Sequence, residues 1–288
     1  MTDETRDAVG KAVESTVEAA VEAVRRPVVA KLAKLGFYTK GTLFIVIGTL
    51  AVMMAKGIDG GEAADAKGAL AYIAGERFGK IVLVVFIVGA FGHGLWNVLR
   101  GIADIDNSGR GWQAIVMRCA AIAIGLFYWG LAYSALDIIL AARVNVVNSD
   151  TEETLVALLI SIPVIGALLV SLIGLGVIGA GFHECYNGFS GKFRDNYRLW
   201  EVTKLHHGFI IAMGVASFTA RAVLLVIMGY FFVRAGVFGL TDGSLGLDAS
   251  MLALLGSTYG RVLVFAAGMG LVAHGILAFY EARFRRLF

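Results

Sequence analysis

The sequence contains little proline, little cysteine and little charge. Only 2 prolines and 2 cysteines occur in 288 residues, and 16% of the residues are charged, against about 25% in an ordinary soluble domain. Two cysteines, Cys119 and Cys185, are too few for a disulfide framework, and reduced thiols are the simplest interpretation. The residues up to Lys34 lack the apolar core of a cleavable signal peptide. We therefore expect the first membrane helix to be the targeting signal and to be retained.

Hydrophobic residues, by contrast, make up 58% of the chain, and glycine is abundant at 37 residues. Six apolar segments recur, at about 37–55, 81–99, 115–141, 155–182, 208–236 and 260–280. Each is near or above the roughly 20 residues that cross about 30 Å of hydrocarbon. Because backbone polar groups in lipid must be satisfied within their own segment, these segments are predicted to be helices. The expected fold is an all-α membrane protein with six transmembrane helices.

Fixed spacings indicate an internal repeat of two helices. A basic residue opens each odd-numbered segment and a glycine opens each even-numbered one: Lys40 and Gly79, Arg118 and Gly166, Arg221 and Gly260. Fourteen residues after each glycine come His93, Ala180 and His274. The sequence thus predicts three tandem two-helix repeats, at 31–105, 106–192 and 193–288, the last with a basic tail.

Short apolar stretches precede the even-numbered segments, at 69–74, 156–162 and 251–256. We expect brief, half-buried helices there, which lead the chain back into the bilayer. The even-numbered segments are also crowded with glycine, and small residues let helix backbones approach closely in lipid. The even-numbered helices are therefore predicted to form the inner set of the bundle.

Residues 1–30 form a charged, alanine-rich leader. Its valines are spaced by three or four residues and share one helical stripe: Val9, Val13, Val17, Val21, Val24 and Val28. This pattern predicts an amphipathic cytosolic helix that lies on the bilayer or on the protein. A coiled-coil arm that binds a protein partner is the alternative.

The distribution of positive charge predicts the orientation. Of the 25 Lys and Arg residues, 18 fall on the side of the amino terminus and 7 on the opposite side. We expect the chain to cross the inner (plasma) membrane several times. Under the positive-inside rule, both termini are expected in the cytosol. The expected partners are the lipid bilayer and its anionic lipids, with no nucleic acid.

Several stretches resemble the bacterial membrane family known as domain of unknown function 1206, which consists of three two-helix repeats. They are Lys67-Gly68-Ala69-Leu70 with Phe78-Gly79-Lys80, Tyr259-Gly260-Arg261 through His274-Gly275, Gly188-Phe189-Ser190-Gly191-Lys192-Phe193, and Arg283-Phe284-Arg285-Arg286. The resemblance covers about residues 31–288. The middle copy departs most, because Arg118 is followed by Cys119 where a glycine is expected. The resemblance implies the fold and adds no chemistry, since the family has no assigned activity.

The basic residues Lys40, Arg118 and Arg221 are the most interesting candidate site. If the repeats surround a pseudo-threefold axis, equivalent positions form a ring near the cytosolic face. Such a ring could hold a phosphate, a carboxylate or an anionic lipid head group. Long basic side chains at helix starts also reach for lipid head groups without forming a site, and this structural alternative stays open.

Two histidines, His93 and His274, occupy equivalent positions late in the second and sixth segments. Histidines at matched depth on different helices could clamp a haem or a transition metal. Each could equally be a structural residue, hydrogen-bonded near the interface. No cysteine–histidine spacing typical of zinc occurs in the sequence, and we expect no metal and no cofactor.

The sequence lacks the signatures of two known classes of membrane protein. A serine–histidine rhomboid protease would use Ser171 with a histidine, but Ser171 lacks the glycine two residues ahead that accompanies an oxyanion hole. Mitochondrial carriers also have three two-helix repeats, but their proline–acid–basic signature is missing from this sequence. We therefore expect that the protein is not an enzyme.

These observations favour two classes of function, and a third is a further alternative. The first is a membrane protein that binds or conducts a small anion or a lipid head group through the cationic layer. The second is a structural protein that holds a partner at the membrane through its leader and basic tail. The third is a redox protein carrying haem or metal.

Overall fold

The computed structural model describes residues 15–22, 26–58, 64–105, 111–141, 162, 165–196, 204–239 and 246–284, and these ranges contain no strand. Six of their helices are long and apolar enough to cross a membrane. They are α2 (Pro27–Lys56), α4 (Gly79–Ala103), α5 (Trp112–Ala141), α7 (Ile165–Ser190), α8 (Lys204–Phe238) and α10 (Gly260–Phe284). The prediction of an all-α fold with six apolar spans is confirmed. Within the leader, residues 15–22 are helical, while 1–14 and 23–25 lie outside the described ranges.

Short helices precede two of the long ones, as their apolar stretches predicted. Helix α3 (Ala66–Gly75) leads into α4, and α9 (Leu247–Leu255) leads into α10. The predicted counterpart at 156–162 falls almost entirely outside the described ranges. Asp65 caps α3 by accepting a hydrogen bond from the Gly68 amide at 2.6 Å.

The glycine that opens each following helix has a steric reason. A Cβ at Gly79 would collide with the carbonyl oxygen of Ile73, and one at Gly260 with that of Leu255. The chain therefore folds back so tightly between the short and the long helix that only glycine fits. This requirement explains why glycine recurs at this position in the sequence.

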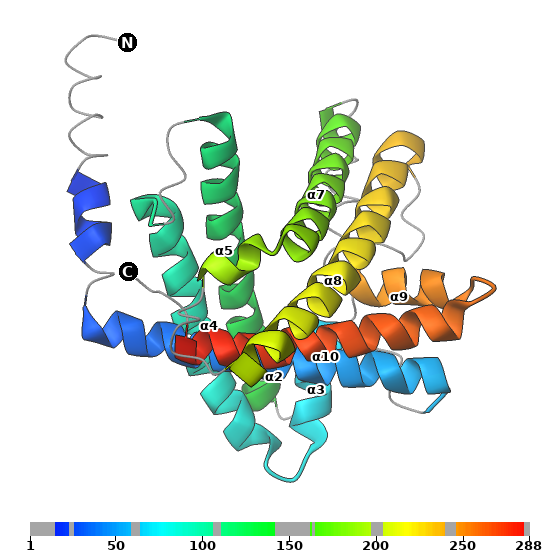
Figure 1. Ribbon diagram of the computed structural model, residues 1–288, viewed down its shortest axis with the longest axis horizontal. Coiled ribbons are helices and arrows are strands. Elements are labelled where there is room, and N and C mark those ends of the chain that lie inside the picture. Colours follow the sequence, from blue (N-terminus) through cyan, green and yellow to red (C-terminus); the bar gives the residue numbers. More distant parts are fainter. Residues whose placement is uncertain are drawn as a thin grey trace.

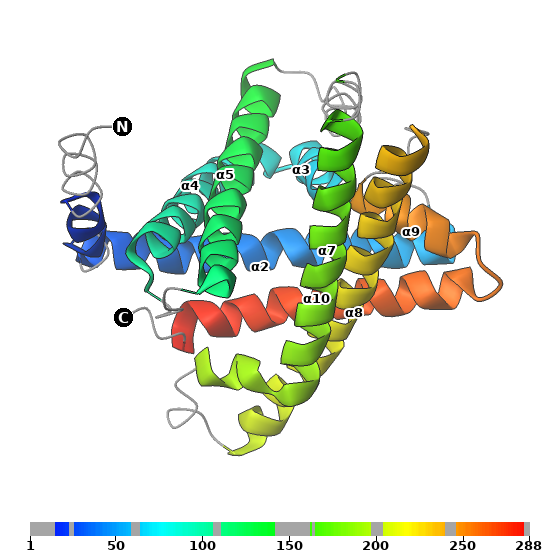
Figure 2. The same cartoon turned by 90° about the horizontal axis from the view of Figure 1, so that it is seen from above.

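The long helices form three closely packed pairs: α2 with α10, α4 with α5, and α7 with α8. Figures 1 and 2 show α2 and α10 side by side, with the other two pairs inclined steeply to them. On α2, a Cβ at Gly41 would lie 2.8 Å from the carbonyl oxygen of Gly275, and one at Gly48 would lie 2.6 Å from that of Gly268. Glycine contacts of the same kind join the other pairs, at Gly94 with Gly125 and at Gly174 with Gly229. In lipid, such backbone contact replaces the hydrophobic effect as a source of helix association.

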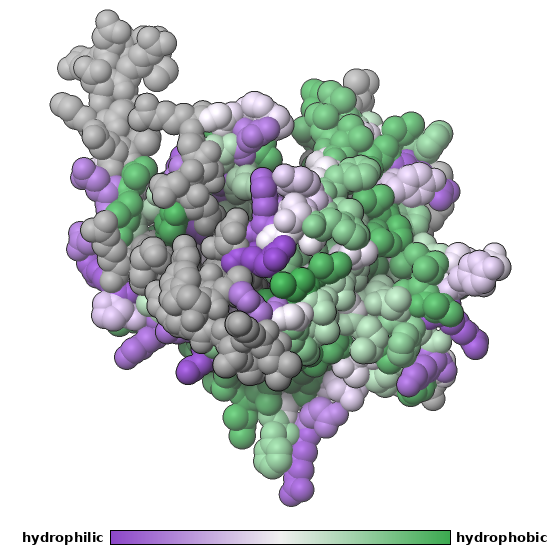
Figure 3. Space-filling view, viewed as in Figure 1, coloured by the Kyte–Doolittle hydropathy of each residue, from purple (hydrophilic) through white to green (hydrophobic). Residues whose placement is uncertain are grey.

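The predicted inner set of even-numbered helices is only partly right. Helices α4 and α10 are indeed central, since 50% and 56% of their most apolar windows are buried, but α2 reaches 50% as well. Helix α7 is the most peripheral at 22%. Of its glycines, Gly174, Gly181 and Gly188 face a single partner, α8, while a Cβ at Gly176 or Gly179 would meet nothing within 4 Å. Figure 3 shows apolar side chains over α7 and α8, as expected for a surface in lipid.

One pair of neighbouring helices in the chain does not come together. Helix α2 packs on α4, and α8 packs on α10, but α5 and α7 do not pack along each other over their described residues. Figures 1 and 2 show these two helices diverging. The ring of long helices is therefore interrupted between α5 and α7.

Candidate functional site

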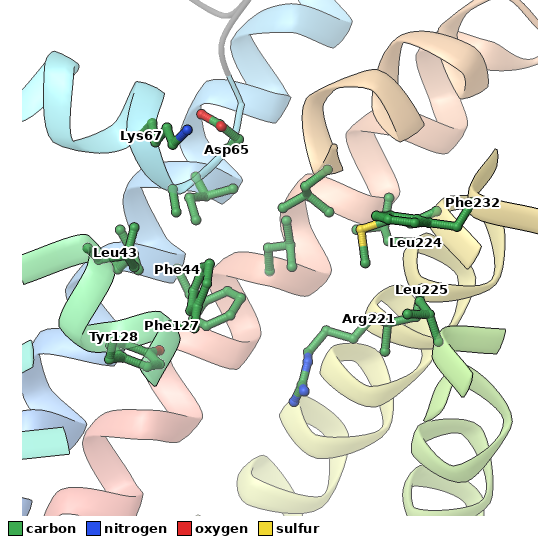
Figure 4. A pocket seen from close by; sticks show the side chains of 17 residues that line it. Leu43, Phe44, Asp65, Lys67, Phe127, Tyr128, Arg221, Leu224, Leu225 and Phe232 are labelled. Atoms are coloured by element: carbon green, nitrogen blue, oxygen red, sulfur yellow. The ribbon is translucent and has the colours of Figure 1, made fainter. Parts of the chain in front are cut away.

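A cavity of about 510 Å³ lies between α2, α5 and α8. This volume falls within the range of about 300–1,000 Å³ found for ligand pockets. Its walls are mostly apolar, and include Leu43, Phe44, Ile47, Phe127, Leu131, Leu224, Leu225, Met228, Phe232 and Leu271. The charged residues stand at its two ends, with Arg221 at one end and Asp65 and Lys67 at the other (Figure 4).

Helix α8 supplies one wall because its cavity residues recur every three or four positions. Arg221, Leu224, Leu225, Met228 and Phe232 all line the cavity, which places them on one face of the helix. From Arg221 to Phe232 is 11 residues, or about 16 Å along the helix axis. The cavity is thus an apolar channel with a guanidinium at one end.

Arg221 is held in place by residues from two other helices. Its guanidinium donates to a carboxylate oxygen of Glu184 on α7 at 3.0 Å, and lies 3.4 Å from the Nε2 atom of His274 on α10. The two side chains of the ion pair are 26% and 17% exposed, so the pair is largely screened from solvent. The second carboxylate oxygen of Glu184 is buried and makes no hydrogen bond within the described part of the chain.

The His274 ring is buried and oriented by its neighbours. Its Nδ1 atom lies 2.7 Å from the Ser217 hydroxyl, and the Phe44 ring stands edge-on to it at 4.5 Å between centroids. Ser217 has no exposed surface and does not line the cavity, so its hydroxyl positions the imidazole and does not face a ligand. This serine–histidine contact could not be found from the sequence, because the two residues are 57 positions apart.

Lys40 lies close to the same histidine but pairs with a different acid. Its ammonium donates to a carboxylate oxygen of Glu281 at 3.0 Å, between side chains that are 16% and 13% exposed. Lys40 directly precedes Gly41, which contacts the backbone of Gly275 next to His274. The structure therefore brings together two of the three predicted cations with one predicted histidine.

Arg118 stands apart from these residues. Its guanidinium donates to the carbonyl oxygens of Gly101 and Ile102, both at 2.7 Å, at the carboxyl end of α4. Those carbonyls have no partner within their own helix, so Arg118 acts as a cap. It thus fills a structural role, and does not join Lys40 and Arg221 in a ring.

The glycine contacts explain this separation. Lys40 directly precedes Gly41, whose backbone touches Gly275 on the partner helix. Arg221 directly precedes Ala222, which touches Gly181 in the same way. On α5 the matching contact is made by Gly125, and the residue before it is Ile124. Arg118 lies six residues before Ile124, which is about 9 Å along the helix and about 120° around it. An apolar residue therefore occupies the third position that the spacing had predicted to be basic.

The second predicted histidine, His93, is buried between aromatic rings. The rings of Phe37 and Tyr128 stand edge-on to it, at 5.2 and 4.4 Å between centroids. Tyr128 also lines the cavity, so His93 supports the cavity wall from behind. Among the described residues, no group of three His, Cys, Asp or Glu side chains could hold a metal ion. The sequence-based expectation of no metal stays a prediction.

Ser171, the residue considered for a protease, is engaged within its own helix. Its hydroxyl donates to the carbonyl oxygen of Ala167 at 2.8 Å, and it packs against Gly236 of α8. This contact is structural. Sequence reasoning also missed the acids Glu184 and Glu281, for which an acidic residue near the end of a long apolar helix was the available signal.

Comparison with known proteins supports the predicted resemblance. The sequence profile of the family described as Domain of Unknown Function (DUF1206) matches residues 35–104 and 216–285. The chain is also 24% identical over 262 residues to the uncharacterized protein YxxB of Bacillus subtilis (strain 168), covering 91% of this chain and 93% of that protein. No solved structure is significantly similar.

The two matched segments are equally long, and the cation and histidine of each lie at the same distances from its start: Lys40 and His93 in one, Arg221 and His274 in the other. Residues 106–192 are not matched, so the assignment of a third repeat there stays a prediction. Two segments of the chain are therefore similar to the domain of unknown function 1206, one in the first two-helix unit and one in the last.

Proposed function

We propose that this membrane protein binds an amphiphilic anion in the cavity, with the anionic head at Arg221 and the apolar body along the channel. The observation that carries the proposal is a guanidinium, 26% exposed as a side chain, at one end of a cavity whose walls between the charged ends are mostly apolar. Ionisable groups within membrane helices are costly and usually serve a function. Of the three cations predicted from the sequence, only Arg221 lines the cavity, so the proposed site is narrowed to Arg221.

Arg221 has donors to spare for a ligand. A guanidinium carries five N–H groups, and its contacts with Glu184 and His274 use two of them within the described part of the chain. Planar carboxylate and phosphate heads accept two parallel hydrogen bonds from such a group. Glu184 fixes the guanidinium before a ligand arrives, so the side chain loses little conformational freedom on binding.

Apolar contacts would supply the rest of the affinity. Phe44, Leu224, Met228 and Phe232 line the channel beyond Arg221. Burial of apolar surface stabilises by about 25 cal/mol per Å² before the costs of association are subtracted. An amphiphile with a slender apolar body is therefore favoured over inorganic phosphate or any other small, fully hydrated anion.

The test compares two arginine variants. Arg221→Gln removes the proposed ligand contact, and Arg118→Gln is the matched control because Arg118 caps α4 at a distance from the cavity. Delipidated protein is titrated with phosphatidylglycerol, oleate and phosphatidylcholine, and bound lipid is counted by native mass spectrometry. Hydrogen bonds to charged groups contribute about 1.5–3 kcal/mol, so Arg221→Gln should weaken binding of the anionic lipids roughly 10- to 150-fold.

Phosphatidylcholine serves as the neutral reference, and the Arg118→Gln variant should bind like the wild type. The oleate and phosphatidylglycerol titrations separate a carboxylate head from a phosphate head. Equal retention of both anionic lipids by wild type and Arg221→Gln protein would overturn the proposal.

We further propose that the protein lies in the plasma membrane with both termini in the cytosol. The excess of Lys and Arg on one side supports this orientation. In it, Arg221 marks the end of the cavity that is nearer the cytosol, and Asp65 and Lys67 mark the outer end.

A further inference from the structure

We infer that the ligand is an acyl-chain lipid of the bilayer and that it enters the cavity sideways, between α5 and α7. This inference rests on the proposed function, because it concerns the same cavity and the same Arg221. It adds the class of ligand and the route by which the ligand arrives. Three observations carry it: the residues at the cavity edge, the surface outside that edge, and the length of the channel.

The edge of the cavity is open where α5 and α7 diverge. Phe127 of α5 lines the cavity and is nevertheless 51% exposed, so its ring stands at the mouth. Val177, half-buried, lines the cavity from α7. Around the rest of the cavity the long helices contact their neighbours, whereas α5 and α7 do not pack along each other in their described parts.

The surface outside this mouth is apolar. Helices α5 and α7 have the least buried apolar windows of the six, at 28% and 22%. The side chains that they expose near the mouth include Leu126, Ile173 and Leu175. Such a surface faces hydrocarbon, not water. A ligand that passes between α5 and α7 therefore comes from the acyl-chain region of the membrane.

The channel has the length of an acyl chain in one leaflet. From Arg221 to Phe232 the channel runs about 16 Å along α8, and half of a hydrocarbon core about 30 Å thick is about 15 Å. With the head at Arg221, the chain would end near Phe232 and α9, whose Leu247 closes the wall there. The apolar cavity thus extends the hydrocarbon of the leaflet into the protein.

The experiment measures how fast a photoactivatable lipid labels residues inside the cavity while the protein is embedded in a membrane. Protein is reconstituted in phosphatidylcholine vesicles with phosphatidylglycerol that carries a photoactivatable diazirine near the end of one acyl chain. Samples are illuminated at successive times after lipid addition, and adducts are mapped by mass spectrometry. Adducts are expected on Met228 and Phe232 inside the channel.

Variants at the mouth test the route. Val177→Trp should slow the labelling of Met228 several-fold, because the added bulk narrows the mouth. Phe127→Ala should speed the labelling by widening the mouth. Leu175→Trp is the control, since Leu175 lies on the same helix, is exposed and does not line the cavity.

The outcomes separate this inference from the function on which it rests. If Met228 and Phe232 are never labelled, or are labelled equally in Arg221→Gln protein, the proposed function itself fails. If they are labelled to a plateau that needs Arg221, but neither Val177→Trp nor Phe127→Ala changes the rate, the sideways route is wrong.

Discussion

At the scale of single residues, the surroundings of a charge decide its role. Arg118 and Arg221 are the same residue type in comparable parts of the chain, yet one caps a helix and the other ends a cavity. Lys40 and Glu281 form a third arrangement, an ion pair buried between α2 and α10. Inside a membrane protein, such a pair is expected to be strongly coupled, because a single unpaired charge cannot be solvated.

The Lys40–Glu281 pair yields the first residue-scale prediction. Glu281→Gln should destabilise the protein by roughly 3–5 kcal/mol, the usual loss when one partner of a buried ion pair is removed. Lys40→Met should cost a similar amount. The double variant should be more stable than the sum of the two losses implies, since neither charge is then left alone. Thermal unfolding of the four proteins in one detergent measures this, and simple additivity would show that the two charges do not interact.

At the scale of elements, glycine sets how closely two helices approach. The α2–α10 pair makes backbone contacts at Gly41 and Gly48, seven residues or two turns apart. This spacing was visible in the sequence, but the partner of each glycine was not. The short lead-in helices α3 and α9 were predictable, because an apolar run too short to span a membrane must lie at its edge. The peripheral position of α7 was not predictable, since a glycine-rich face shows only that a helix has a close partner.

The glycine contacts yield an element-scale prediction. Gly48→Leu should destabilise the fold by about 1–3 kcal/mol or more, because its side chain would enter the backbone of α10 near Gly268. Gly130→Leu is the matched control, since a Cβ at Gly130 meets nothing within 4 Å. The control should be neutral or slightly stabilising, because leucine favours helix over glycine by up to about 1 kcal/mol. Unfolding temperatures in detergent provide the measurement, and equal temperatures for both variants would contradict the packing.

At the scale of the whole molecule, three tight pairs and one gap define the architecture. The pairs α2–α10, α4–α5 and α7–α8 each join helices that belong to different predicted repeats. Contact within a repeat is found for α2 with α4 and for α8 with α10, the two units matched by the family profile. The unmatched middle unit holds α5 and α7, which diverge. The proposed lipid entrance thus falls in the part of the chain that the family profile does not match.

The whole-molecule prediction is the topology. Reporter fusions after Arg110 and Asn196 should be cytosolic, and fusions after Asp59, Ser149 and Asp242 should be external. The reason is the charge asymmetry between the two sides together with six apolar spans. Paired reporters that are active on opposite sides of the membrane give the measurement. A cytosolic signal after Ser149 would mean that α5 does not cross, and would remove the middle pair of spans.

The sequence by itself determined the number of long helices, the two lead-in helices and the two related units. These follow from local constraints, because a segment in lipid must satisfy its own backbone and a tight reversal admits only glycine. Tertiary structure alone decided that Arg221 meets Glu184 and His274, and that Arg118 turns to the end of α4. Each residue turns a helix by about 100°, so contact between helices depends on register and rotation. Spacings along the chain do not specify either one to within a residue.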